Sequence, residues 1–147
     1  MGYRHAVNRK ALVSALVLAL GALAPTPAAG QRTSPPRERR LGTLGQNFPN
    51  PFRPATWIPF SVDDCNGRGG QRVVSLRVYN VLAQLVATPV LHGASVPVAG
   101  VRLSCGNYLA YWDGRVMRGH RPATSGVYVY ELVIDGQRTS RKMFVAR

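Results

Sequence analysis

The chain has 147 residues, and 19 Lys and Arg against six Asp and Glu give it a formal net charge of +13. This length suits a single domain, and the apolar content of 46% excludes an intrinsically disordered protein. Frequent glycine and proline with few charged residues favour a turn-rich β protein over a helical bundle, and two cysteines exclude a disulfide-dense miniprotein and a four-cysteine zinc site.

The first thirty residues have the pattern of a secretory leader. A basic start precedes an uncharged apolar run over residues 11–24, and prolines and small residues follow it up to Gly30. We therefore predict a signal peptide over residues 1–30 that is cleaved before Gln31. The alternative is an uncleaved membrane anchor, a hydrophobic helix over residues 11–29. Both predict export across the inner membrane, to the periplasm or the cell surface.

Residues 31–44 are polar and basic and contain two prolines, so we predict a linker that leads to a folded domain over residues 45–147. Seventeen of the 19 basic residues are arginines, and they are scattered rather than clustered among stacking aromatic side chains. That distribution and the predicted export argue against a nucleic-acid partner. We expect a protein partner with an acidic surface, or anionic lipid or lipopolysaccharide; charge that serves solubility alone is the alternative.

Cys65 and Cys105 are the only cysteines. Outside the cytoplasm such a pair is expected to be disulfide-bonded. Closing a loop of about forty residues stabilises a fold by roughly 3–4 kcal/mol. Two free buried thiols are the alternative.

Period-two alternation of apolar residues predicts β-strands along most of the domain. Pro59 lacks an N–H group, so its strand is expected at a sheet edge or at a bulge. Asp135-Gly136 lies between two β-rich runs and predicts a tight hairpin. Six strands are predicted in this way, over residues 58–62, 73–80, 85–91, 107–112, 127–134 and 137–146. With no sustained helical period after Gln31, the chain is predicted to form an antiparallel β-sandwich of six or seven strands.

Five short motifs occur in a fixed order, at residues 47–52 (NFPNPF), 78–88 (VYNVL with LVAT), 112–115 (WDGR), 125–132 (SGVYVYEL) and 141–144 (RKMF). In this order they resemble the C-terminal sorting domain of type IX secretion cargo and the related Ig-like domain of the flagellar hook-capping protein. The resemblance implies a small Ig-like β-sandwich that is read as an address by a translocon and is often removed after export. The family usually has glycine at the position of Ala83.

We also predict a structural role for individual motif residues. The prolines fix the backbone of a segment that Phe48 and Phe52 pin to the sandwich, Asp113-Gly114 forms a turn, and Gly126 lets the chain bend into a central strand. The structural motif residues are Asn47, Phe48, Pro49, Asn50, Pro51, Phe52, Trp112, Asp113, Gly114, Gly126 and Met143.

No residue pattern indicates catalysis, a metal site or a cofactor. His5, His92 and His120 are far apart and lack acidic or cysteine partners at ligand spacing. Residues 63–67 (DDCNG) match half of a calcium loop, but Gln71 and Arg72 stand where a closing glutamate is needed. We therefore expect a protein that is not an enzyme.

The last predicted strand is the candidate recognition element, because a strand at a sheet edge can pair with a partner strand. Arg138, Arg141, Lys142 and Arg147 would add positive charge there, and Tyr128 and Tyr130 belong to an aromatic set that could form an exposed patch. The alternatives are an edge protected by its own charges and tyrosines packed in the core.

These observations lead to two functional hypotheses. The first is an exported, non-catalytic Ig-like module that resembles a type IX sorting domain and acts by protein–protein recognition with secretion machinery. The second is a small membrane-anchored accessory subunit of a larger complex in the cell envelope membrane, which docks its basic sandwich on an acidic partner surface.

Overall fold

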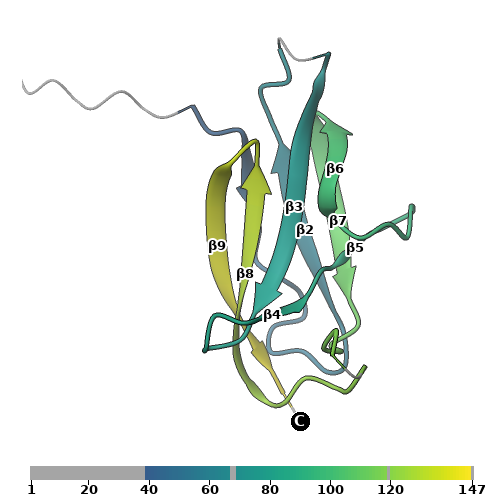
Figure 1. Cartoon of the computed structure of the whole chain (residues 1–147), viewed down its shortest axis with the longest axis vertical. Helices are drawn as coiled ribbons and strands as arrows, with labels where there is room; N and C mark the ends of the chain where they lie inside the picture. The colour runs from purple at the N-terminus through teal and green to yellow at the C-terminus, as the bar shows by residue number, and fades with distance from the viewer. Residues whose placement is uncertain (1–38, 67–68, 119, 147) are drawn as a thin grey trace, which may run out of the picture. The chain divides into compact units, whose positions relative to one another are not determined.

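A computed structural model describes residues 39–66, 69–118 and 120–146, and the predicted signal or anchor lies outside this part of the chain. The described residues form only β-strands and connecting turns (Figure 1). The strands are β1 (Gly42–Leu44), β2 (Thr56–Val62), β3 (Gln71–Tyr79), β4 (Leu85–Ala87), β5 (Val90–Leu91), β6 (Ala99–Ser104), β7 (Gly106–Trp112), β8 (Gly126–Ile134) and β9 (Gln137–Val145).

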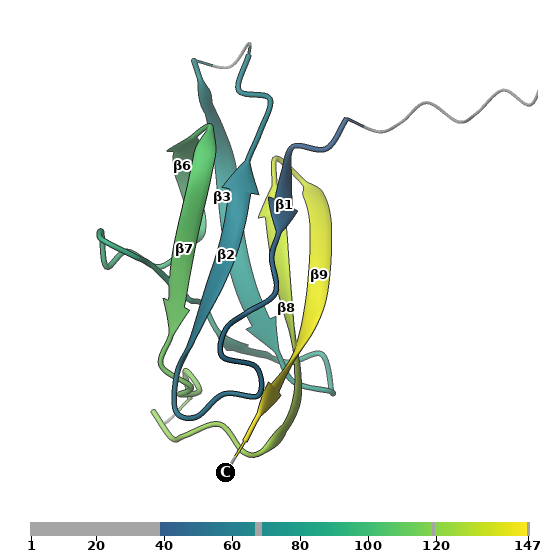
Figure 2. The ribbon, with the colours of Figure 1, turned by 180° about the vertical axis from the view of Figure 1, so that it is seen from behind.

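The strands form two antiparallel sheets that face each other (Figure 2). Sheet A has the order β1-β2-β7-β5. Sheet B has the order β4-β3-β8-β9, and β6 pairs with β3 on the same side as β4. The prediction of an all-β protein built from two antiparallel sheets is therefore confirmed.

Nine strands are found in the described residues, so the prediction of six or seven is wrong in number. The additional strands are short or weakly patterned. β1 has three residues and falls within the predicted linker, and β6 has only one buried side chain. The predicted strand over residues 85–91 divides around Pro89 into β4 and β5, which belong to different sheets.

Neither alternative predicted for Pro59, a sheet edge or a bulge, is found, because β2 lies between β1 and β7 and its register with β7 is continuous through Pro59. The ladder between β1 and β2 ends at the pair Leu44 and Phe60, one residue before Pro59. The carbonyl of Pro59 still accepts a hydrogen bond from the N–H of Gly45 at 2.8 Å. An internal strand tolerates proline here because its neighbouring strand has just ended.

Alternating side chains of β2, β3 and β8 fill the space between the sheets. Phe52 packs edge-on against Trp112, with ring centroids 5.3 Å apart, and Trp112 packs in the same way against Tyr128. The buried apolar core consists of Leu44, Phe52, Ile58, Phe60, Val62, Val74, Leu76, Val78, Ala87, Val98, Leu103, Ala110, Trp112, Tyr128, Tyr130, Leu132, Ile134 and Met143.

The predicted disulfide between Cys65 and Cys105 is present, with Cα atoms 5.6 Å apart. Cys65 lies between β2 and β3, and Cys105 lies between β6 and β7. At each of these positions the chain passes from one sheet to the other. The disulfide therefore joins two sheet crossings at the same end of the sandwich.

Candidate functional site

The outer edge of β9, predicted as the recognition element, is covered by the chain itself over its C-terminal half. β9 is the last strand of sheet B, as expected. Residues 50–52 pair with its C-terminal half: Phe52 N donates to Phe144 O at 3.0 Å, and Ala146 N donates to Phe52 O at 2.9 Å. Asn50 Oδ1 accepts from Phe144 N at 2.9 Å. These bonds satisfy the groups that a partner strand would need.

The N-terminal half of β9 is occupied by contacts with β1, which runs beside it in Figure 2. Gln137 Oε1 accepts a hydrogen bond from Leu41 N at 2.8 Å, and Arg141 Nε donates to Leu44 O at 2.6 Å. Along the backbone edge itself, Gln46 Nε2 donates to Lys142 O at 3.3 Å, while the outward groups of Arg138 and Ser140 and the N–H of Lys142 make no hydrogen bond to a described residue. The stretch of residues 138–142 is therefore the part of the β9 edge that the described chain leaves open.

The predicted recognition residues do not form one surface. Arg138 pairs with Glu131 at 3.1 Å, while Lys142 is exposed, and Arg147 lies outside the described residues. Tyr128 and Tyr130 are 6% and 0% exposed. The prediction that these two tyrosines form an exposed aromatic patch is therefore wrong, because they lie on the face of β8 that packs against sheet A.

Tyr130 belongs to a buried polar network under the first motif. Its hydroxyl accepts from Asn47 N at 3.0 Å and donates to Gly45 O at 2.8 Å. Asn47 Nδ2 in turn donates to Thr56 Oγ1 at 2.9 Å and to Pro49 O at 3.0 Å. Burial raises the pKa of the Tyr130 phenol, against smaller lowering effects from the hydrogen bond with Asn47 and from Arg141. The motif asparagine is thus a structural residue.

The two motif phenylalanines behave differently from each other. Phe52 is 1% exposed and packs in the core, as predicted, whereas Phe48 is 50% exposed. The prediction that both side chains anchor residues 47–52 to the sandwich is therefore wrong for Phe48. Its backbone pairs with Trp57 instead, in both directions at 2.8 and 2.9 Å. Pro49 contributes its carbonyl to the Asn47 network, and Pro51 is exposed.

The remaining motif residues have structural roles. Trp112 Nε1 donates to Arg115 O at 2.9 Å, and Asp113 Oδ1 accepts from Arg115 N at 2.9 Å. Gly114 has a φ of 73°, and a Cβ there would overlap Pro54 O. Gly126, at the start of β8, has a φ of 149°, and Met143 is fully buried on β9.

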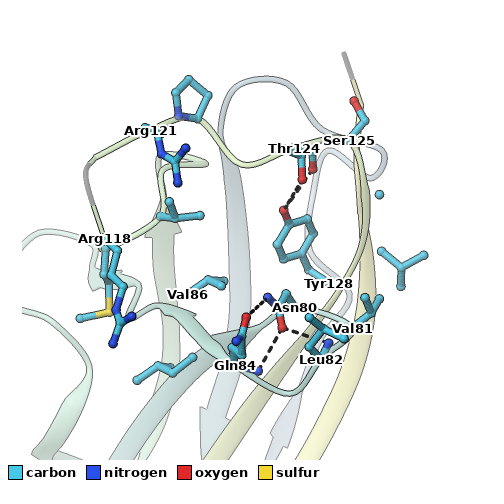
Figure 3. A pocket seen from close by; sticks show the side chains of 16 residues that line it. Asn80, Val81, Leu82, Gln84, Val86, Arg118, Arg121, Thr124, Ser125 and Tyr128 are labelled. Carbon is cyan, nitrogen blue, oxygen red and sulfur yellow. Dashed lines mark hydrogen bonds between the residues drawn. The ribbon is translucent and has the colours of Figure 1, made fainter.

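The turn between β3 and β4 lies at the end of the sandwich opposite the connection between β2 and β3 that holds Cys65 (Figure 1). A groove with a volume of about 900 Å³ lies at this end (Figure 3). The turn between β3 and β4 forms one wall, and the segment between β7 and β8 forms the other. Tyr128 lies in the groove between them, and its hydroxyl donates to Thr124 O at 3.1 Å. The volume is within the range of sites that bind small ligands or short segments.

Hydrogen bonds from one side chain shape the first wall. Asn80 Oδ1 accepts from Leu82 N and Gln84 N, both at 3.0 Å, and Asn80 Nδ2 donates to Gln84 Oε1 at 2.8 Å. Ala83 takes a φ of 57°, a left-handed conformation that favours glycine. The turn therefore holds Val81 and Leu82 outward rather than letting them pack inside.

The second wall is also fixed by backbone hydrogen bonds. Met117 N donates to Val86 O at 2.7 Å, which attaches this wall to β4. Val116 N donates to Arg121 O at 2.9 Å, and Ala123 N donates to Gly114 O at 2.7 Å. Hydrogen bonds within the chain therefore position both walls.

The groove combines exposed aliphatic side chains with unpaired cations. Val81, Leu82 and Met117 are 74%, 73% and 55% exposed. Arg118 and Arg121 lie on the opposite rim, and neither forms an ion pair with a carboxylate of the described residues (Figure 3). Among the predicted recognition residues that the structure describes, only Tyr128 lines the groove. Sequence reasoning missed the rest of this site because its two walls come from segments far apart in the sequence. The one local signal was an apolar pair, Val81-Leu82, in a turn.

The other residues considered for metal binding or catalysis do not come together in the described part of the fold. Asp64, from the partial calcium pattern, forms ion pairs with Arg39 at 3.2 Å and with Arg72 at 3.4 Å. His92 packs edge-on against Trp57. Within the described ranges, no three His, Cys, Asp or Glu side chains come together to hold a metal ion, and no helix is long and apolar enough to span a membrane.

Comparison with known proteins gave no match to a family model, to a curated protein or to a solved structure.

Proposed function

We propose that the chain is an exported, non-catalytic Ig-like β-sandwich module that acts by binding another protein. The observation that carries this proposal is the groove, where rigid turns hold aliphatic side chains in solvent. Soluble proteins seldom keep such side chains together on the surface unless a partner covers them. The ordered motifs that resemble a type IX sorting domain support the same class of function.

Export is supported by the disulfide, because such bonds persist in oxidising compartments. The basic start and apolar run of residues 1–30 support it independently. Together they favour the periplasm or cell surface as the place where the partner is met.

The first experiment measures compartment, thiol state and N-terminus together. The full chain is expressed in a Gram-negative host, free thiols are alkylated without reduction, and each cell fraction is analysed by intact mass. A soluble envelope form that begins at Gln31 with both cysteines unmodified supports the exported module. A membrane form that retains Met1 supports the anchored accessory subunit instead. A cytoplasmic form with two alkylated cysteines contradicts both.

The second experiment tests recognition directly. A photo-crosslinking amino acid replaces Leu82 in the groove or, as an exposed control, Arg102 on β6. In the cell envelope of the source organism, a protein adduct specific to position 82 is expected. Equal labelling at both positions, or none at position 82, contradicts recognition through the groove.

A further inference from the structure

We propose that the groove binds a short acidic segment of another protein, one that alternates carboxylate side chains with aliphatic ones. This inference rests on the proposed function and adds the chemistry of the partner. It follows from the positions of two kinds of side chain on the two walls.

The first wall selects aliphatic side chains. Val81 and Leu82 are held at the tip of the turn by Asn80 and expose about three quarters of their surface. Leu85 continues the same apolar wall and is 47% exposed. Because the turn is already fixed, covering these side chains orders few further groups, and little entropy is lost on binding.

The second wall selects carboxylates. Arg118 and Arg121 are exposed and have no acidic partner among the described residues, and none of the side chains that line the groove is acidic. Arg115, on the same segment, differs because its guanidinium already donates to His120 O at 2.8 Å. Arginine forms paired hydrogen bonds with a carboxylate, so two arginines on one rim that pair with no acidic residue of the described chain favour an acidic ligand.

Charge argues against a second copy of the chain as the occupant, and shape argues against a membrane. A second copy of the chain would bring its own arginines and its net charge of +13 against this rim, and like charges oppose association. A membrane surface is flat, whereas the aliphatic side chains here line a hollow between two walls (Figure 3). A chain segment fits this shape better than a bilayer does.

The test is selection of a random-peptide display library on the full chain, purified from the cell envelope with the disulfide intact. We expect enrichment of peptides that contain Asp or Glu together with Leu, Ile or Val. An enriched peptide is then synthesised with a fluorophore, and its dissociation constant is measured by anisotropy. Binding should weaken as salt is added, because the arginines are exposed.

Two variants separate the walls, and a third is the matched control. Arg118→Glu/Arg121→Glu should weaken binding about tenfold or more, and Val81→Ser/Leu82→Ser should weaken it as well. Arg40→Glu/Arg102→Glu makes the same change in charge away from the groove and should leave binding unchanged. All of these side chains are exposed, so the variants should fold, which circular dichroism checks.

Three outcomes would overturn the inference. They are no enriched peptide, enriched peptides without carboxylates, and a control variant that weakens binding as much as the groove variants do. Binding to phosphatidylglycerol vesicles without binding to peptides would assign the groove to a membrane instead. A failure of this test leaves export and the crosslink at position 82 unaffected, so it can be distinguished from failure of the proposed function.

Discussion

Replacing Tyr130 by Phe tests whether the buried polar network holds the first motif to the core. The change removes one oxygen and keeps the ring, so it creates almost no cavity in the packing. Two hydrogen bonds are lost, from Asn47 N at 3.0 Å and to Gly45 O at 2.8 Å. The Asn47 amide is the more costly loss, because that residue is only 2% exposed and water cannot easily replace the phenol.

A buried donor left without a partner costs about 1–3 kcal/mol, and a lost hydrogen bond to a more accessible group costs about 0.5–1.5 kcal/mol. The free energy of unfolding of Tyr130→Phe should therefore fall by about 2–4 kcal/mol, a large part of the roughly 5–15 kcal/mol of a typical domain. Urea unfolding of the disulfide-bonded protein measures this difference, with an unchanged slope expected. Tyr111→Phe is the control, because the Tyr111 hydroxyl makes no hydrogen bond to a described residue.

The difference between Tyr130 and Phe should also depend on pH. Burial raises the pKa of the folded-state phenol above its ordinary value of 10.0. Above about pH 10 the unfolded chain therefore loses this proton more readily than the folded protein, and the stability from Tyr130 decreases as pH rises. The advantage of the parent over the variant should be constant below that pH and shrink above it. A variant within about 0.5 kcal/mol of the parent, or an advantage that grows with pH, would refute this account.

Three further changes test other features of the fold. Ala83→Gly should raise the free energy of unfolding by about 0.5–1 kcal/mol, because it relieves a left-handed conformation; a lower melting temperature would contradict this. Gly114→Ala should cost more than about 3 kcal/mol, because its Cβ would overlap Pro54 O. Gly93→Ala is its control, since Gly93 also has a positive φ but has open space around it, and equal losses would show that the overlap is unimportant. Cys65→Ala/Cys105→Ala should lower stability by about 4 kcal/mol in urea unfolding, and no loss would contradict the loop-closure argument.

The sequence predicts the central strands well because each has one face in the core. β2, β3 and β8 alternate without interruption, and a shift of one residue would expose every apolar side chain. The hairpin at Asp135-Gly136 was predictable for a local reason. Both residues take positive φ values, which these two residue types accept readily.

Other features depend on contacts distant in the sequence. β1 is short, and its place beside β2 is reinforced by side chains of β9 from nearly one hundred residues later. Nothing local distinguishes Phe48 from Phe52, yet only Phe52 reaches the core. The tyrosines of β8 carry polar hydroxyls, but buried backbone groups satisfy that of Tyr130. The groove could not be predicted either, because it forms only where two separate turns meet.

The pairing of residues 50–52 with β9 makes this chain self-complementing. A ribosome or a translocon that works from the N-terminus delivers the covering segment before the strand that needs it. The C-terminal half of the last strand can therefore be covered as soon as it joins the sheet, which shortens the edge that a neighbouring molecule could pair with. A fragment that began after Phe52 would keep β2 to β9 but lose this seal, and its bare edge would recruit a strand from another copy.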